Sequence, residues 1–232
     1  MKSIKVAIVL IISLSLVWSK TLSKVEVEES PVFKSVGNVS VEHTYRSINS
    51  RSDTTTIFFE NFEGTTGWTG LDLTVPAAMW HIDDFNTPDG TGTSWWMGDP
   101  TIGGYYDHSY VTLDSPEILV PTSGHLTFDL NYNVEDPAGA EVPYNGWDGC
   151  NIRISTNSGS TWSVISGTPA YSSSSLYSFG FEHGEGANIP GYTGSSGGWV
   201  SADYDLSSFA GQNVMIRFAF ASDPAYSTLD NP

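Results

Sequence analysis

Carboxylates carry most of the chemistry available to this 232-residue chain, which has 26 Asp and Glu residues against nine Lys and Arg. Calcium ions take six to eight oxygen ligands, which carboxylates and backbone carbonyls on separate loops can supply. Glu60 and Glu63 lie in the first strand expected of the folded part, and Asp223 follows the last. Asp148 sits in a Gly-Trp-Asp-Gly run whose glycines let backbone carbonyls approach. We expect these four residues to hold a structural Ca²⁺.

The same residues also fit a role in turns, because Asp and Asn side chains readily hydrogen-bond the nearby backbone. This alternative applies above all to a second acidic loop containing Asp83, Asp84, Asn86 and Asp89. The spacing of that loop does not match an EF-hand. The sequence leaves both interpretations of its acidic clusters open.

Three hydrolase signatures are absent or out of context. None of the five histidines opens an HExxH zinc motif. Residues 194–198 read GSSGG and so match GxSxG, but that motif needs a strand-to-helix turn, and this stretch is a Gly/Ser run. Glycosidases need paired carboxylates, for which Glu182 and Glu185 are the nearest candidates, in a loop where solvation is the simpler interpretation. We therefore expect no catalytic residue and no enzyme activity.

Four aromatic residues, Trp95, Trp96, Tyr105 and Tyr106, flank a glycine-rich loop at 98–104. Exposed aromatic rings stack on the apolar faces of sugars and also anchor protein partners. Neighbouring residues of a strand face opposite ways, so at least one of the two tryptophans belongs in the core. We expect the remaining rings to form the ligand-binding surface, for an extracellular glycan or protein.

Charge and cysteine content narrow the possible partners. The formal net charge of −17 repels phosphate backbones and anionic lipid headgroups, so nucleic acid is not an expected partner. The single cysteine, Cys150, rules out an internal disulfide framework. Its place on the inward face of an expected strand makes it a small core hydrophobe.

The N-terminus has the pattern of a secretory signal peptide: Lys2 and Lys5 precede an apolar run at 6–17. We expect cleavage after Ser19 and a secreted or cell-surface protein. The apolar run is short for a membrane span, and we expect none in the mature chain. Residues 20–55 have no sustained periodicity and are interpreted as a tether or pro-segment, so the folded part is expected at 56–232.

Alternating apolar and polar residues dominate the folded part. The clearest case is 125–135, with Leu126, Phe128, Leu130, Tyr132 and Val134 on one face. Residues 146–165 predict a hairpin whose first strand turns Asn151, Arg153 and Ser155 toward solvent. Further strands are expected at 78–83, 94–98, 110–113, 199–206 and 213–222. No segment predicts a long amphipathic helix, so the fold class is an all-β antiparallel sandwich or jelly roll.

Several separated motifs together resemble a known module. They are FENFEG at 59–64, WHID at 80–83, SWWMG at 94–98, LDSPEI at 113–118, GWDG at 146–149, DL at 205–206 with AGQ at 210–212, and IRF at 216–218 leading to SD at 222–223. Their order is similar to that of the MAM-like, non-catalytic β-sandwich of immune inhibitor A-type secreted metallopeptidases. The resemblance implies a jelly roll from about residue 57 onward, and a closing strand that would follow Pro232.

The expected function is a non-catalytic recognition or adhesion module of a larger secreted or surface-anchored bacterial protein, braced by calcium. One alternative is an accessory domain of a secreted metallopeptidase or polysaccharide hydrolase whose catalytic part lies elsewhere. Another is a purely structural spacer. The downstream reading frame would separate these alternatives.

Overall fold

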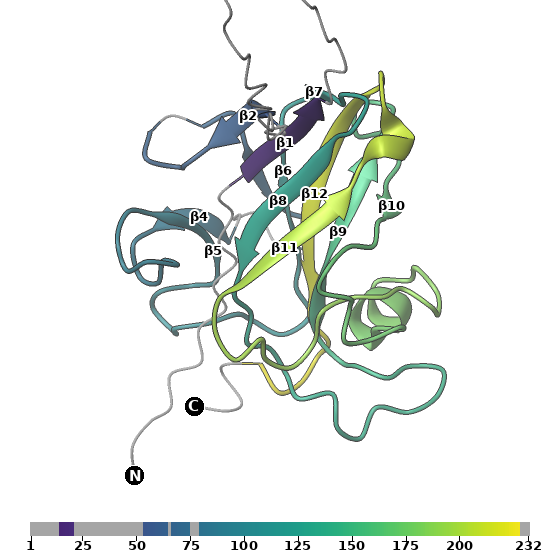
Figure 1. The fold of residues 1–232 in the computed structure, drawn as a ribbon. Helices are drawn as coiled ribbons and strands as arrows, with labels where there is room; N and C mark the ends of the chain where they lie inside the picture. Colours follow the sequence, from purple (N-terminus) through teal and green to yellow (C-terminus); the bar gives the residue numbers. More distant parts are fainter. Residues whose placement is uncertain (1–13, 21–52, 65, 75–78, 228–232) are drawn as a thin grey trace, which may run out of the picture.

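The structure is a computed structural model that describes residues 14–20, 53–64, 66–74 and 79–227. This part of the chain consists mainly of antiparallel β-strands, as the alternating sequence patterns predict, arranged in two larger sheets and a separate hairpin (Figure 1). The only helical turns among these residues are the short segments η1 (Ser178–Glu182) and η2 (Ser207–Phe209). The coarse prediction of an all-β fold is confirmed.

The strands of the two sheets come from distant parts of the chain. One sheet has the order β11-β8-β1-β2, comprising Val200–Asp205, His125–Leu130, Leu14–Lys20 and Asp53–Glu60. The other has the order β10-β9-β12-β6-β3, comprising Ser163–Val164, Gly149–Ser155, Asn213–Ala221, Tyr110–Asp114 and Thr69–Asp72. A short strand, β7 (Ile118–Leu119), pairs with β12, and the hairpin consists of β4 (Trp80–Asp83) and β5 (Ser94–Met97).

One continuous apolar core joins the inner faces of the two larger sheets. The inward residues predicted for 125–135 are all buried. So are the alternating apolar residues that predict the inward face of 213–222, namely Val214, Ile216, Phe218 and Phe220. Phe128 of β8 meets Phe218 of β12 edge to face at 5.1 Å between ring centroids, which links the two layers directly. Burial of such apolar area stabilises the fold by about 25 cal/mol per Å².

The hairpin predicted at 146–165 is present, since β9 and β10 pair antiparallel. The prediction that its polar face is open to solvent is wrong: Asn151, Arg153 and Ser155 are buried. The long excursion between β10 and β11 folds back over this face, and the amide of Asn151 donates to the backbone oxygen of Pro190 at 2.9 Å. Alternation in the sequence reports side-chain polarity, and a later loop can still cover a polar face.

Two glycines allow the excursion to lie directly on β9. A Cβ on Gly149 would collide with the backbone oxygen of Tyr192, and a Cβ on Gly191 would lie 2.7 Å from the backbone oxygen of Cys150. Between them, Cys150 and Tyr192 exchange backbone hydrogen bonds of 3.0 and 2.8 Å. The excursion therefore extends the second sheet locally, beside the start of β9.

The N-terminal predictions are only partly within the described residues. Residues 1–13 and 21–52 lie outside them. The end of the predicted signal peptide, from Leu14 to Ser19, forms β1 together with Lys20, and this strand pairs with β2 and β8. The signal peptide and the tether stay predictions. None of the helical segments among the described residues has the length and apolar character needed to cross a membrane.

Candidate functional site

Strand register brings two acidic residues together at one end of the second sheet. Gly149, the first residue of β9, pairs with Ala221, the last residue of β12. Asp148 immediately precedes this pair and Asp223 follows it by two residues, so the two carboxylates meet beyond the strand ends. The backbone N–H of Asp223 donates to Oδ1 of Asp148 at 2.7 Å.

A third carboxylate joins them from the other sheet. Glu135 lies five residues after β8, and one side-chain oxygen each of Glu135, Asp148 and Asp223 fall within 4.8 Å of one another. We call these three residues the carboxylate triad. Glu135 ends the alternating stretch 125–135, and in the sequence nothing but this position at the end of a strand distinguishes it, so its place in the triad was not predicted.

The hydroxyl of Tyr105 holds two members of the triad in place. It donates to Oδ2 of Asp148 at 2.7 Å and accepts the backbone N–H of Glu135 at 3.2 Å. The Tyr105 ring packs edge to face on Phe220 at 4.9 Å, so the inward face of β12 fixes its position. Burial, together with the negative charge of Asp148, raises the pKa of Tyr105 and keeps its hydroxyl protonated.

The triad is largely buried and contains only acidic side chains. Asp148 is fully buried, and Oε2 of Glu135 is shielded from solvent without any hydrogen-bond partner among the described residues. Burial, with repulsion from Asp223, Asp107 and Asp136, raises the pKa of Glu135 to about 8. Burial is also the main reason why the pKa values of Asp148 and Asp223 lie above their usual range.

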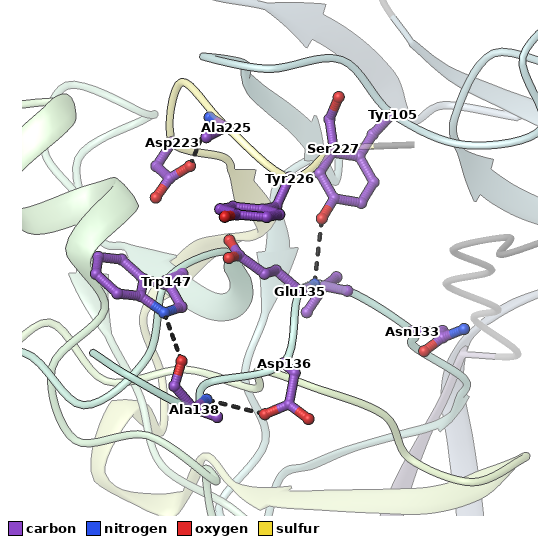
Figure 2. Close-up of a pocket in the computed structure, with 11 residues that line it drawn as sticks. Tyr105, Asn133, Glu135, Asp136, Ala138, Trp147, Asp223, Ala225, Tyr226 and Ser227 are labelled. Carbon is purple, nitrogen blue, oxygen red and sulfur yellow. Dashed lines mark hydrogen bonds between the residues drawn. The ribbon is translucent and has the colours of Figure 1, made fainter. Parts of the chain in front are cut away.

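A cavity of about 670 Å³ opens beside the triad (Figure 2). Figure 2 shows the side chains of Glu135, Trp147 and Tyr226 converging on the same region. The described residues that line the cavity include no Lys or Arg; they are Tyr105, Asn133, Val134, Glu135, Asp136, Ala138, Trp147, Asp223, Ala225, Tyr226 and Ser227. The arrangement can accept a cation at its acidic end and can place a ligand against aromatic rings at its mouth.

Two of the four predicted calcium ligands lie elsewhere. The carboxylate of Glu60 accepts the backbone N–H of Phe62 at 2.9 Å, and Oε1 of Glu63 accepts the backbone N–H of Thr93 at 2.7 Å. Neither residue belongs to the triad, so the grouping of Glu60 and Glu63 with Asp148 and Asp223 needs correction. Their carboxylates instead fix the turn after β2 and hold it to the loop before β5.

The predicted aromatic ligand surface also needs correction. Trp95 and Trp96 are only 7% and 2% exposed, so both rings serve as packing and offer no free face. Half-buried Tyr106 donates to a carboxylate oxygen of Asp99 at 2.6 Å. Only Tyr105 lies at the cavity, where its hydroxyl organises the triad. Alternation could not show that the β4–β5 hairpin buries both tryptophans.

The remaining motifs have structural partners. Ser196 of the GxSxG match accepts the backbone N–H of Tyr132 at 3.0 Å and lies in a loop without a following helix. Glu185 pairs with Arg153 at 2.9 Å, and Glu182 lies 3.4 Å from His108. In the second acidic loop, Asp89 accepts the backbone N–H of Thr91 at 2.9 Å, the turn role that the alternative interpretation expected.

Comparisons of this chain with protein-family models, with curated proteins and with solved structures give no match. The interpretation of the site therefore depends on its own geometry.

Proposed function

We propose that the chain is a non-catalytic recognition module of the antiparallel sandwich or jelly-roll class, secreted or displayed on the cell surface, and braced by calcium at the carboxylate triad. The observation that carries the proposal is the meeting of Glu135, Asp148 and Asp223 beside a cavity whose described lining holds no basic residue. Three carboxylates this close repel one another unless they are protonated or share a cation.

The chemistry of the donors favours Ca²⁺ over softer metals. All three side chains offer oxygen, and His and Cys are absent from the triad. Both oxygens of Asp148 already accept a protein hydrogen bond, from Tyr105 and from the backbone of Asp223. Three carboxylates do not by themselves complete the six to eight ligands of Ca²⁺, so water or a ligand in the cavity would supply the rest.

Calcium titration of the full chain tests the brace. At about 100 times the dissociation constant, binding to the folded state adds about 2.7 kcal/mol of stability. At about 3 °C per kcal/mol, the melting temperature should rise by about 8 °C over that in EDTA. Isothermal titration calorimetry should show one site.

Variants locate the site. Asp148→Asn and Glu135→Gln should each abolish the calcium-dependent rise, whereas Glu63→Gln should retain it. Glu135 is the less buried of the two, so Glu135→Gln remains informative if Asp148→Asn does not fold. A wild-type chain that calcium does not stabilise, or a rise that Glu63→Gln abolishes and Glu135→Gln keeps, would overturn the assignment.

Secretion is tested separately by N-terminal sequencing of protein recovered from the medium of a bacterial host, where we expect the mature chain to begin at Lys20. That chain lacks most of β1 (Leu14–Lys20), yet all three triad residues lie in other segments. It should therefore keep the calcium response. Retention inside the cell with Met1 intact would contradict the proposed location.

A further inference from the structure

We infer that the mouth of the cavity binds a neutral oligosaccharide, through aromatic rings gathered around Tyr177 and through the acceptors of the cavity wall. This inference rests on the proposed recognition role but does not depend on calcium. The rings concerned, Tyr144, Trp147, Tyr177 and Phe181, are called the Tyr177 cluster below.

The Tyr177 cluster is a rigid set of rings outside the main core. Tyr177 contacts Tyr144 and Trp147 edge to face, at 5.2 and 5.3 Å between centroids, and stacks on Phe181 at 5.0 Å. Phe181 is 62% exposed, although it is a large apolar side chain. Trp147 is the member of the cluster that also lines the cavity, and through its contact with Tyr177 the other rings adjoin the cavity.

The backbone around the cluster is fixed by hydrogen bonds. The N–H groups of Tyr177 and Ser178 donate to the oxygens of Gly146 and Trp147 at 2.8 and 3.1 Å. The indole Nε1 of half-buried Trp147 donates to the backbone oxygen of Ala138 at 3.1 Å, which sets the ring plane. A surface held in this way loses little conformational entropy when it binds a ligand.

The chemistry of this surface matches a saccharide. Aromatic rings stack on the apolar C–H faces of pyranose rings. Glu135, Asp136 and Asp223 provide carboxylate oxygens in the cavity beside Trp147, and its described lining has no Lys or Arg. Such a surplus of acceptors suits a ligand that is dense in hydroxyl donors. A peptide offers only one backbone N–H per residue and fits the surplus less well.

Charge restricts the class of glycan. The chain carries a formal net charge of −17, and the acidic cavity adds local repulsion. Glycans that bear carboxylate or sulfate groups are therefore disfavoured. A volume of about 670 Å³ lies within the range of about 300–1,000 Å³ typical of small-ligand sites, so the cavity itself would hold the end of a short chain.

The experiment is an array of neutral oligosaccharides (cello-, xylo-, manno- and chito-oligosaccharides) beside sialylated, uronic and sulfated ones, probed with the full chain in Ca²⁺ and in EDTA. Calorimetry with the best neutral ligand follows. Trp147→Ala and Phe181→Ala should each weaken binding at least tenfold. Phe85→Ala is the matched control, because Phe85 is 55% exposed and stacks on Trp96 in the β4–β5 region; it should change binding less than twofold.

Several outcomes would overturn the inference: no neutral glycan bound, a preference for acidic glycans, binding unchanged in Phe181→Ala and Trp147→Ala, or binding of proline-rich peptides in place of glycans. If no glycan on the array binds but calcium clearly raises the melting temperature, the inferred glycan site is overturned and the calcium brace stands. Glycan binding without a calcium-dependent rise would support the glycan site and overturn the calcium brace.

Discussion

Two buried polar clusters flank the second sheet, and they differ in how their charge is balanced. On the outer face of β9, Arg153 pairs with Glu185 at 2.9 Å and lies 4.6 Å from the centroid of the Phe179 ring. At the end of the same strand, the carboxylate triad contains three acids and no basic residue. The first cluster contains its own cation, and the second does not.

The difference separates a structural cluster from a binding site. The hydroxyl of Tyr110 also donates to Glu185, at 2.7 Å, so that carboxylate has both an ion-pair partner and a hydrogen-bond partner within the fold. Among the described residues, Oε2 of Glu135 in the triad and Nη2 of Arg153 in the first cluster are both buried without a hydrogen-bond partner. The Arg153 guanidinium nevertheless has an opposite charge beside it, and the carboxylate of Glu135 has only other acids. Buried charge without a partner is costly, so the triad is complete only when protons or a cation enter it.

Removing the carboxylate that balances Arg153 in the first cluster should have the largest effect on stability. Glu185→Ala leaves the Arg153 guanidinium buried without its ion-pair partner, and this should lower the free energy of unfolding by about 3 kcal/mol. Urea denaturation measures the loss. The control is Glu141→Ala, which removes an exposed carboxylate and should change stability by less than about 0.5 kcal/mol. Equal stability of the two variants would show that the ion pair between Arg153 and Glu185 does not stabilise the fold.

Tyr105→Phe should have the next largest effect, because it removes the hydroxyl shared by Asp148 and the backbone of Glu135. We expect a loss of about 2 kcal/mol in EDTA and weaker calcium binding. Tyr106→Phe is the matched control, since that hydroxyl bonds Asp99 in a more open setting and should matter less. If both variants unfold at the same urea concentration, Tyr105 does not organise the triad.

A change of pH should have the smallest effect, and its sign tests the triad directly. The folded chain holds the pKa of Glu135 at about 8, above its ordinary 4.5, so the folded state binds the proton more tightly than the unfolded chain. The contribution of Glu135 to the free energy of unfolding is complete below about pH 4.5 and is lost as the pH rises through about 8. Because this carboxyl is partly solvated, we expect a contribution of about 1 kcal/mol.

In EDTA, thermal unfolding of the wild type should therefore show a falling contribution from Glu135 between pH 5 and pH 8, which Glu135→Gln removes. Saturating Ca²⁺ should reduce or reverse the fall, since calcium replaces the proton. A wild type and a Glu135→Gln variant with the same pH dependence would show that Glu135 keeps its ordinary titration.

Short sequence patterns predicted the strands well. They predicted the contacts between distant segments less well. The inward faces of β8 and β12 followed from period-two alternation, because that pattern directly reflects one buried side. Asp148 and Asp223 were predicted as partners, and the pairing of Gly149 with Ala221 explains why they meet. Glu135 was missed because only the packing of the two sheets brings it to them. The burial of Arg153 likewise depends on a distant segment, the one that carries Glu185. Trp96 is packed by His81 and Phe85 of its own hairpin region, which alternation along one strand does not reveal.

Cys150, the only thiol in the chain, lies in the core on β9, and burial raises its pKa to about 12. Thiolate, and not the protonated thiol, attacks a disulfide reagent such as Ellman's, so the folded molecule should react with it extremely slowly. The rate at which the reagent labels Cys150 therefore measures how often the core beside β9 opens. The same rate, measured with and without an added metal ion or sugar, shows whether that ligand keeps the native protein closed.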